Sequence, residues 1–430
     1  MRRLANHPLV RSRSLSLSRY LALRRLVALS ASVAGTALFA QSSADGKVTH
    51  GAQESELFKI NASYSLQTDS NLFRLPAGAD TLALIGRSSA AEQIGVASLG
   101  LHVNKAYSLQ RVELDFNVND YRYRHFSYLD FTSFNYGAAW RWSLTPGLRG
   151  NLIAERKQTP NSFLDYQGYT VRNEHRDTNF RFDALYEIDG VWRLLAGAAT
   201  TRQVNLLPVI AEGDTSAVSA DIGLRYAFAS GSTLTYGLKN ASGKFLNRGL
   251  QPETLLDDGY RQIDNDVRLH WLVYGKGTAD VNAAYVVRSH PHFAQRDYSG
   301  FNTGVSLNWP VTGKSALGAS WARELASYQS DTANYSQTDR ISLGPVWQVS
   351  PKAAIRLRYE VAFRNFLGSP TGVAASRRSD TTREATLSLD WQPYQRVKLG
   401  ASLQNAKRTS NLAGLDFNSN LATFFAQYSY

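Results

Sequence analysis

Apolar and polar side chains alternate along most of the chain beyond residue 54, and no long apolar run interrupts them. Side chains of a β-strand point alternately to opposite faces, so each alternating segment predicts a strand with one apolar and one polar face. A soluble β-sandwich would show the same alternation, because its outer face is wet. The clearest such segments are 58–66, 112–118, 180–186, 222–228 and 355–363.

The connections between the predicted strands separate the two folds, because short turns alternate with long polar loops. The short turns fall at 104–106, 145–147, 188–190, 229–231, 275–277, 311–314, 350–352 and 392–395. A transmembrane barrel has one short-turn rim and one long-loop rim, and about 18 strands fit this pattern. We therefore predict an all-β fold, a single up-and-down antiparallel transmembrane β-barrel with short periplasmic turns and long extracellular loops, integral in a bacterial outer membrane.

Aromatic residues gather near the predicted short turns, on the apolar face. Among the eight tryptophans, only Trp321 lies farther from such a turn. A soluble core has no reason to collect tryptophan at one end, whereas indole and phenol rings prefer the headgroup level of a bilayer. The predicted membrane-interface aromatics are Trp140, Trp142, Trp192, Trp271, Trp309, Trp347, Trp391, Tyr428 and Tyr430.

The last ten residues, 421–430, form an alternating segment that ends on an aromatic. An edge strand of a soluble sheet is the simpler interpretation. In a membrane, however, an open edge leaves backbone groups unsatisfied, so the last strand of a barrel must pair with the first. We expect 421–430 to pair with 58–66 and Tyr430 to face lipid. A final aromatic also resembles the signal that barrel proteins present to the barrel assembly machinery, which is an expected partner.

Residues 1–44 are predicted to be a cleaved secretory signal, and 45–54 a short periplasmic linker before the barrel at 55–430. The signal has a long basic region followed by a stretch of small apolar residues that is too short to span a bilayer well. Its removal takes away seven arginines and no acid, which lowers the formal charge from +12 to +5. The basic balance therefore argues little for nucleic acid as a partner.

The polar face of the predicted strands is rich in cations, and acids accompany them. A barrel of this width needs a polar interior, where opposite charges on neighbouring strands pair. The alternative is functional, a water-filled conduit that suits anionic or hydroxyl-rich solutes. The predicted pore-lining residues are Arg141, Arg149, Arg181, Arg193, Arg225, Lys239, Arg268, Arg288, Arg356, Arg358 and Lys398.

No arrangement of residues in the sequence indicates an enzyme, a cofactor or a metal site. Cysteine is absent, which excludes thiol catalysis and cysteine-based metal binding. His290 and His292 form a close pair of loop histidines without an obvious third ligand. The acids at 257–258 could contact a cation, but a glycine follows them, and turn chemistry is the simpler interpretation.

The segment that follows the first predicted strand carries apolar residues where a loop should be wet. It resembles the D-x-N-L-F-R-L element of the exosortase-associated polysaccharide-biosynthesis outer-membrane proteins, the EpsL-like family of β-barrel porins. The segments 121–130 and 140–142 add to the likeness. A simpler explanation is a loop folded into the lumen and packed on its wall. The residues of this loop motif are Asp69, Asn71, Leu72, Phe73, Arg74 and Leu75.

The resemblance implies a role in exporting an extracellular polysaccharide, as a conduit or docking component of the secretion machinery. The expected partners are outer-membrane lipid, the exported polysaccharide and periplasmic export components. Two alternatives stay open: a general diffusion porin for small polar or anionic solutes, and a non-conducting outer-membrane scaffold.

Overall fold

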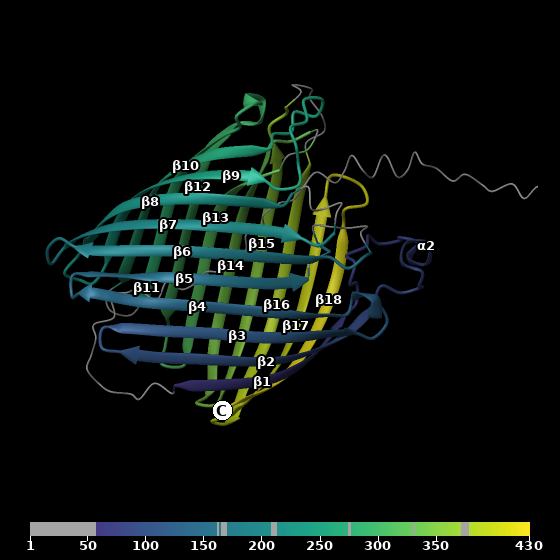
Figure 1. The fold of residues 1–430 in the computed structure, drawn as a ribbon. Coiled ribbons are helices and arrows are strands. Elements are labelled where there is room, and N and C mark those ends of the chain that lie inside the picture. Colours follow the sequence, from purple (N-terminus) through teal and green to yellow (C-terminus); the bar gives the residue numbers. More distant parts are fainter. Residues whose placement is uncertain are drawn as a thin grey trace, which may run out of the picture.

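The computed structural model describes residues 57–160, 163–164, 170–207, 213–273, 277–328, 330, 332–370 and 378–430. Within these ranges the chain is almost entirely antiparallel β-sheet (Figure 1). The predicted signal and linker, residues 1–54, lie outside the described part. No helix of the described residues is long and apolar enough to cross a membrane.

The barrel wall consists of eighteen strands that follow one another around a closed sheet, each paired with its neighbours in sequence. The strands are β1 (Phe58–Asp69), β2 (Glu92–Tyr107), β3 (Gln110–Tyr123), β4 (Phe131–Thr145), β5 (Leu148–Pro160), β6 (Glu174–Glu187), β7 (Trp192–Asn205), β8 (Thr215–Ala227), β9 (Thr233–Phe245), β10 (Gly259–Val273), β11 (Gly277–Ser289), β12 (Tyr298–Pro310), β13 (Ser315–Ser327), β14 (Tyr335–Ser350), β15 (Ala353–Leu367), β16 (Ser379–Tyr394), β17 (Val397–Ser410) and β18 (Phe417–Ser429).

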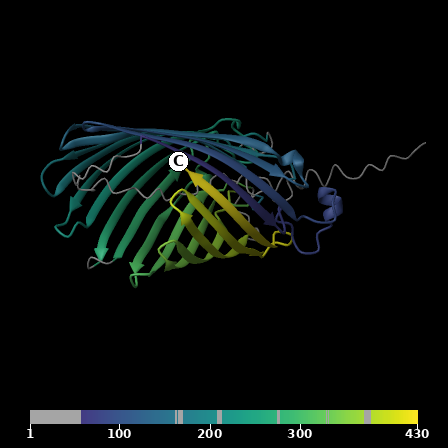
Figure 2. The same ribbon diagram turned by 90° about the horizontal axis from the view of Figure 1, so that it is seen from below.

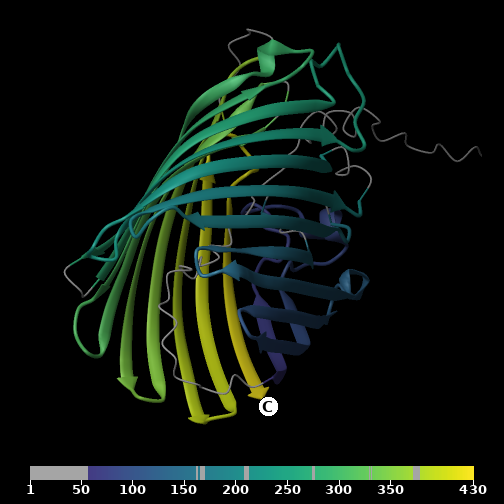
Figure 3. The ribbon, with the colours of Figure 1, turned by 60° about the vertical axis from the view of Figure 1, so that its left-hand side comes forward.

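Closure occurs between β1 and β18, as the sequence predicts. Their register runs from Asn61 opposite Ser429 to Asp69 opposite Leu421. The final residue extends the ladder, because the backbone groups of Tyr430 and Ile60 exchange two hydrogen bonds of 2.8 Å. The sheet thus has no open edge, which is the condition for crossing a bilayer with strands. Figures 2 and 3 show the strands of opposite walls running at an angle to one another.

Short turns join the strands at one rim and longer loops join them at the other. The predicted turns at 145–147 and 350–352 share the short-turn rim, together with the start of β1 and the C-terminus. The turn expected at 104–106 is wrong, because β2 continues to Tyr107 and the chain reverses at Ser108, with φ of 53°. The turn expected at 392–395 is also early, since β16 extends to Tyr394.

The loops named below are loop 1 (70–91), loop 2 (124–130), loop 3 (161–173), loop 5 (246–258), loop 6 (290–297) and loop 7 (328–334), all at the long-loop rim. Loop 1 contains a short helix, α2 (Thr81–Ile85), which projects beyond the ends of the strands (Figure 1). Loops 2 and 6 contain the 3-10 helices η1 (Ser127–Leu129) and η2 (Ala294–Arg296).

The two faces of the wall differ as the alternation predicts. Partners across a ladder share a face, so the register carries the assignment around the barrel. All eight tryptophans fall on one face, together with exposed leucines and phenylalanines. This outer face forms the apolar band that an integral barrel presents to lipid. Phe425 is an exception to the pattern, because it lies on the polar face, near the Lys398 ammonium.

Candidate functional site: the inner wall and the loop rim

All eleven cations expected to line a pore lie on the polar face of the wall. A contact across the barrel supports the assignment of this face to the interior. Arg408 lies on the same face of β17, and its Nη1 donates to the carbonyl oxygen of Leu164 at 2.8 Å. Leu164 belongs to loop 3, which joins β5 to β6. The contact therefore links distant parts of the wall.

Most of the eleven cations have an acidic partner on the same or a neighbouring strand. Arg141 binds Glu113 through two hydrogen bonds of 2.9 Å, and Arg181 binds both Asp183 and Asp221. Many of these pairs face open space, where each contributes little stability. The remaining ion pairs are Arg149–Glu187, Arg193–Glu187, Arg268–Asp266, Arg356–Asp390, Arg358–Glu360 and Lys398–Asp390.

Arg288 and Lys239 differ from these pairs, because neither forms an ion pair with a described residue. The Arg288 guanidinium donates from Nε and Nη2 to the Gln262 side-chain oxygen, at 2.8 and 2.6 Å. The central carbon of the guanidinium, Cζ, lies 3.9 Å from the centre of the Tyr260 ring. The direct partners of Arg288 are thus neutral groups. Arg225 also donates to a neutral group, the Thr235 hydroxyl, at 3.1 Å.

The loop motif 69–75 forms the centre of the largest apolar cluster in the described structure. Phe73 is fully buried, and its ring packs edge-on against Phe126 of loop 2 and Phe163 of loop 3, each at 4.8 Å. The cluster rests on Ile94 and Val96, which belong to the polar face of β2. Of the two explanations given for the motif, the structure thus agrees with a loop packed on the inner wall.

The polar residues of the motif fix its shape. The Asp69 carboxylate accepts two hydrogen bonds from Arg74 Nη1 and one from the Ser419 hydroxyl. The Asn71 side chain closes the turn, since its oxygen accepts from Leu75 N–H at 2.9 Å and its nitrogen donates to Leu75 oxygen at 2.8 Å. Arg74 itself has a positive φ of 56°. These contacts join the end of β1 to β18 at the closure.

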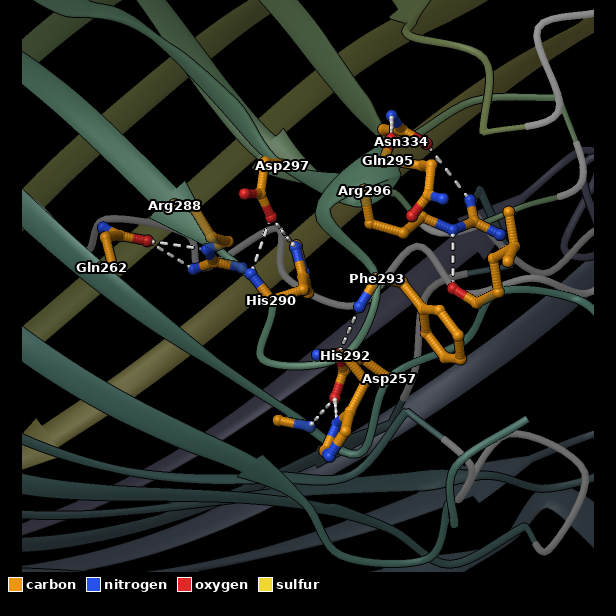
Figure 4. A network of polar contacts seen from close by, with 12 residues as sticks. Asp257, Gln262, Arg288, His290, His292, Phe293, Gln295, Arg296, Asp297 and Asn334 are labelled. Atoms are coloured by element: carbon orange, nitrogen blue, oxygen red, sulfur yellow. Dashed lines mark hydrogen bonds and ion pairs between the residues drawn. The ribbon is translucent and has the colours of Figure 1, made fainter. Parts of the chain in front are cut away.

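A polar clamp joins loops 5, 6 and 7 on another part of the same rim (Figure 4). Its centre is Arg296, which is fully buried although it is charged. The guanidinium donates to the carbonyl oxygens of Thr254, Leu255, Ser330 and Ala333, at 2.7, 3.0, 2.6 and 3.2 Å. Sequence reasoning missed this clamp, because nothing local distinguishes Arg296 from other loop arginines.

Asp257 and His292 form a second link between loops 5 and 6 (Figure 4). The buried carboxylate accepts hydrogen bonds from the backbone N–H of His292 at 2.7 Å and of Phe293 at 3.3 Å. Burial acts to raise the pKa of Asp257, but the hydrogen bonds from His292 outweigh it and lower that pKa to about 2. The hydrogen bond with Asp257 in turn raises the pKa of His292.

The group Asp257, Asp258 and His292 also brings possible metal-binding atoms within 4.8 Å of one another. Sequence analysis identified no third ligand beside the two histidines, because Asp257 and His292 are far apart along the chain. Both Asp257 oxygens already accept hydrogen bonds, including one of 3.3 Å from Gly259 N–H within the turn. This geometry agrees with turn chemistry, and it gives no positive sign of a cation.

The predicted interface aromatics all lie on the outer face, but Trp142 is set apart by its burial. Its side chain is only 9% exposed and stacks on Phe182, with ring centres 5.9 Å apart. Trp347 and Trp391, by comparison, are 54% and 47% exposed. Tyr430 is exposed at 65%, and the guanidinium of Arg396 lies 4.8 Å from the centre of its ring.

Comparison with known structures finds the same fold in proteins of the bacterial outer membrane. No protein-family model and no curated protein matches the sequence. The solved structure of OpdK from Pseudomonas aeruginosa is similar, with 13% identity, a TM-score of 0.51, and coverage of 87% of this chain and 99% of OpdK. OccK2 (OpdF) from the same organism has 12% identity and a TM-score of 0.51 over 86% of this chain and 98% of its own.

A third structure, OccK9 (OpdG) of Pseudomonas aeruginosa, gives 13% identity and a TM-score of 0.51 over 87% of this chain and 98% of that one. Identities this low show a shared fold. The closed eighteen-stranded sheet and its apolar outer face define an integral β-barrel of the outer membrane.

Proposed function

We propose that the barrel is a passive channel for small polar and anionic solutes, without an enzymatic step. The observation that carries the proposal is that two inner-wall cations, Arg288 and Lys239, form no direct ion pair with a described carboxylate. Solved structures of OpdK with vanillate and of OccK2 (OpdF) with glucuronate exist, and both of these ligands are carboxylates. Such a solute would meet a positive field at Arg288 without displacing an existing ion pair.

The test is the ion selectivity of the barrel in a planar bilayer under a salt gradient. Arg288→Gln, combined with Lys239→Gln, should shift the reversal potential toward cation preference, because two positive charges without a direct ion-pair partner leave the wall. Arg141→Gln combined with Glu113→Gln is the matched control, because it removes a charge and its counter-charge together, and it should leave selectivity close to that of the parent. Equal selectivity of the double variant and the parent would contradict the proposal.

Export of an extracellular polysaccharide is the second candidate. The observation that favours it is the loop motif 69–75, the carrier of the family resemblance, which anchors loop 1 at the outer mouth of the barrel. Deletion of the protein separates the candidates. Loss of surface polysaccharide with intact small-solute uptake would support export, whereas reduced uptake with normal polysaccharide would support the channel. A scaffold predicts conductance at the level of protein-free bilayers.

A further inference from the structure

The outer face carries cations near the long-loop ends of several strands, above the apolar band. Six of them form no hydrogen bond or ion pair through their side chains with described residues, and they come in three neighbouring pairs. In the register, two pairs are diagonal neighbours and one pair is directly opposed. The pairs are Arg176 with Arg202, Lys244 with Arg261, and Arg383 with Lys407.

Arg383 on β16 and Lys407 on β17 are directly opposed in the ladder. Like charges in this position destabilise a sheet. On the inner face, Arg111 and Arg141 are also opposed, but Glu113 lies 4.0 Å from the first and 2.9 Å from the second. The outward-facing residues of β15 to β18 include no acid. An anion from outside the protein would therefore relieve the repulsion.

A groove with a volume of about 580 Å³ lies on the outer face directly below this pair. Ala385 and Asn405 are the next outward residues below Arg383 and Lys407, and both line the groove. Small side chains on β16 and β18 leave the space, and leucines form its sides. Besides those two residues, the outward-facing lining includes Leu357, Leu387, Leu403 and Ala422. Its shape and apolar lining suit a hydrocarbon chain.

The height of the cations agrees with the position of outer-leaflet headgroups. Arg261 lies ten residues from Trp271 along β10, and Arg383 lies eight residues from Trp391 along β16. At ~3.3 Å per residue and a strand tilt of about 40°, these separations span roughly 20–25 Å along the membrane normal. The apolar band of such barrels is about 25 Å tall, so the cations mark its extracellular edge.

We propose that Arg383 and Lys407, with the groove below them, bind a phosphorylated glycolipid of the outer leaflet. The phosphate accepts hydrogen bonds from both cations, and an acyl chain occupies the groove. Arginine suits this role, because its planar fork can bind two phosphate oxygens at once. The other two cation pairs extend the same headgroup contact around the barrel. The site is independent of any solute that passes through the lumen.

The experiment measures binding of bisphosphorylated lipid A to the full mature barrel in nanodiscs of zwitterionic phosphatidylcholine. Each basic residue near a charged headgroup should raise the affinity about fivefold. The variant R383Q/K407Q lacks two such residues and should bind about 25-fold more weakly than the parent. Lys105→Gln removes an outward-facing cation at the short-turn end and should stay within about twofold. Ala422→Phe fills the groove without changing charge, and it should weaken binding as well.

Three results would overturn the proposal. The first is parent-like affinity for R383Q/K407Q in a barrel that remains folded by its heat-modifiable gel mobility. The second is equal competition by inorganic phosphate together with unchanged binding by Ala422→Phe, which would indicate a phosphate site without a lipid. Equal binding of phosphatidylglycerol and lipid A would support headgroup charge alone and would contradict the specific role of the glycolipid.

Discussion

The rim of long loops is held together in two different ways on two parts of the barrel. Loops 1, 2 and 3 meet around Phe73, and loops 5, 6 and 7 meet around Arg296; both side chains are fully buried. The first centre excludes water with aromatic rings. The second satisfies a guanidinium with main-chain carbonyl oxygens. The stability of the first centre therefore depends on how well side chains fill its volume. The stability of the second depends on each individual hydrogen bond of Arg296.

This difference implies different tolerances. An apolar cluster keeps much of its stability when one residue is replaced by another of similar size. A buried polar centre loses stability when its donors are fewer than its acceptors, because each unpaired carbonyl keeps its full desolvation cost. The apolar centre is also joined to a buried carboxylate, Glu92, which accepts hydrogen bonds from the backbone N–H of His125 and Phe126. The comparison is therefore between the surroundings of Phe73 and those of Arg296, because the loops around Phe73 also contain buried polar contacts.

The largest expected effect is that of Phe73→Ala, which should reduce the free energy of local opening of loops 1 to 3 by about 4 kcal/mol. The value follows from removing a fully buried aromatic ring and leaving a cavity. Hydrogen exchange of the Leu72 amide, which donates to Ala90 oxygen at 2.9 Å, is the measurement. Leu82→Ala in α2 is the control, since Leu82 is 65% exposed and its loss should change little. Unchanged protection in Phe73→Ala would contradict the role of the cluster.

A smaller loss of loop stability is expected for Arg296→Lys, which keeps the positive charge but loses the planar guanidinium with its several N–H donors. One ammonium cannot reach carbonyl groups from both loops 5 and 7, so some acceptors become unpaired, at a cost of about 1–3 kcal/mol each. Proteolysis of loops 5 and 7 should become faster while loops 1 to 3 remain protected. Arg124→Lys at the exposed edge of loop 2 serves as the matched control. Faster cleavage of both loop groups would show that the two centres are coupled.

The sequence predicted the barrel and the loop motif for the same reason, namely that both are encoded locally. Alternation is visible within each strand, and three apolar residues in a loop stand out without any partner. The contacts between loops 5 and 6 could not be predicted, because Asp257 and His292 are separated by two strands and meet only through the order of the strands in the wall. The turn at 104–106 failed for a related reason: Lys105 and Tyr107 continue the outer face of β2, and pairing with β3 overrides the local turn signal.

The smallest expected effect is a pH dependence confined to the polar centre. Because the folded pKa of His292 is raised, its contribution to stability is complete below its ordinary pKa of about 6.5 and disappears as the pH rises through the raised value. Because the pKa of Asp257 is lowered to about 2, its contribution is complete above about pH 4 and disappears toward pH 2. The link between loops 5 and 6 should therefore be strongest between about pH 4 and pH 6.5.

Exchange of the His292 amide, corrected for intrinsic pH dependence, should accelerate from pH 6 to pH 9 in the parent and show a flat profile in His292→Gln. The Leu72 amide, whose partner does not titrate, is the internal reference. A parallel change at Leu72 would mean that pH acts on the whole rim, and the distinction between the two centres would then be wrong.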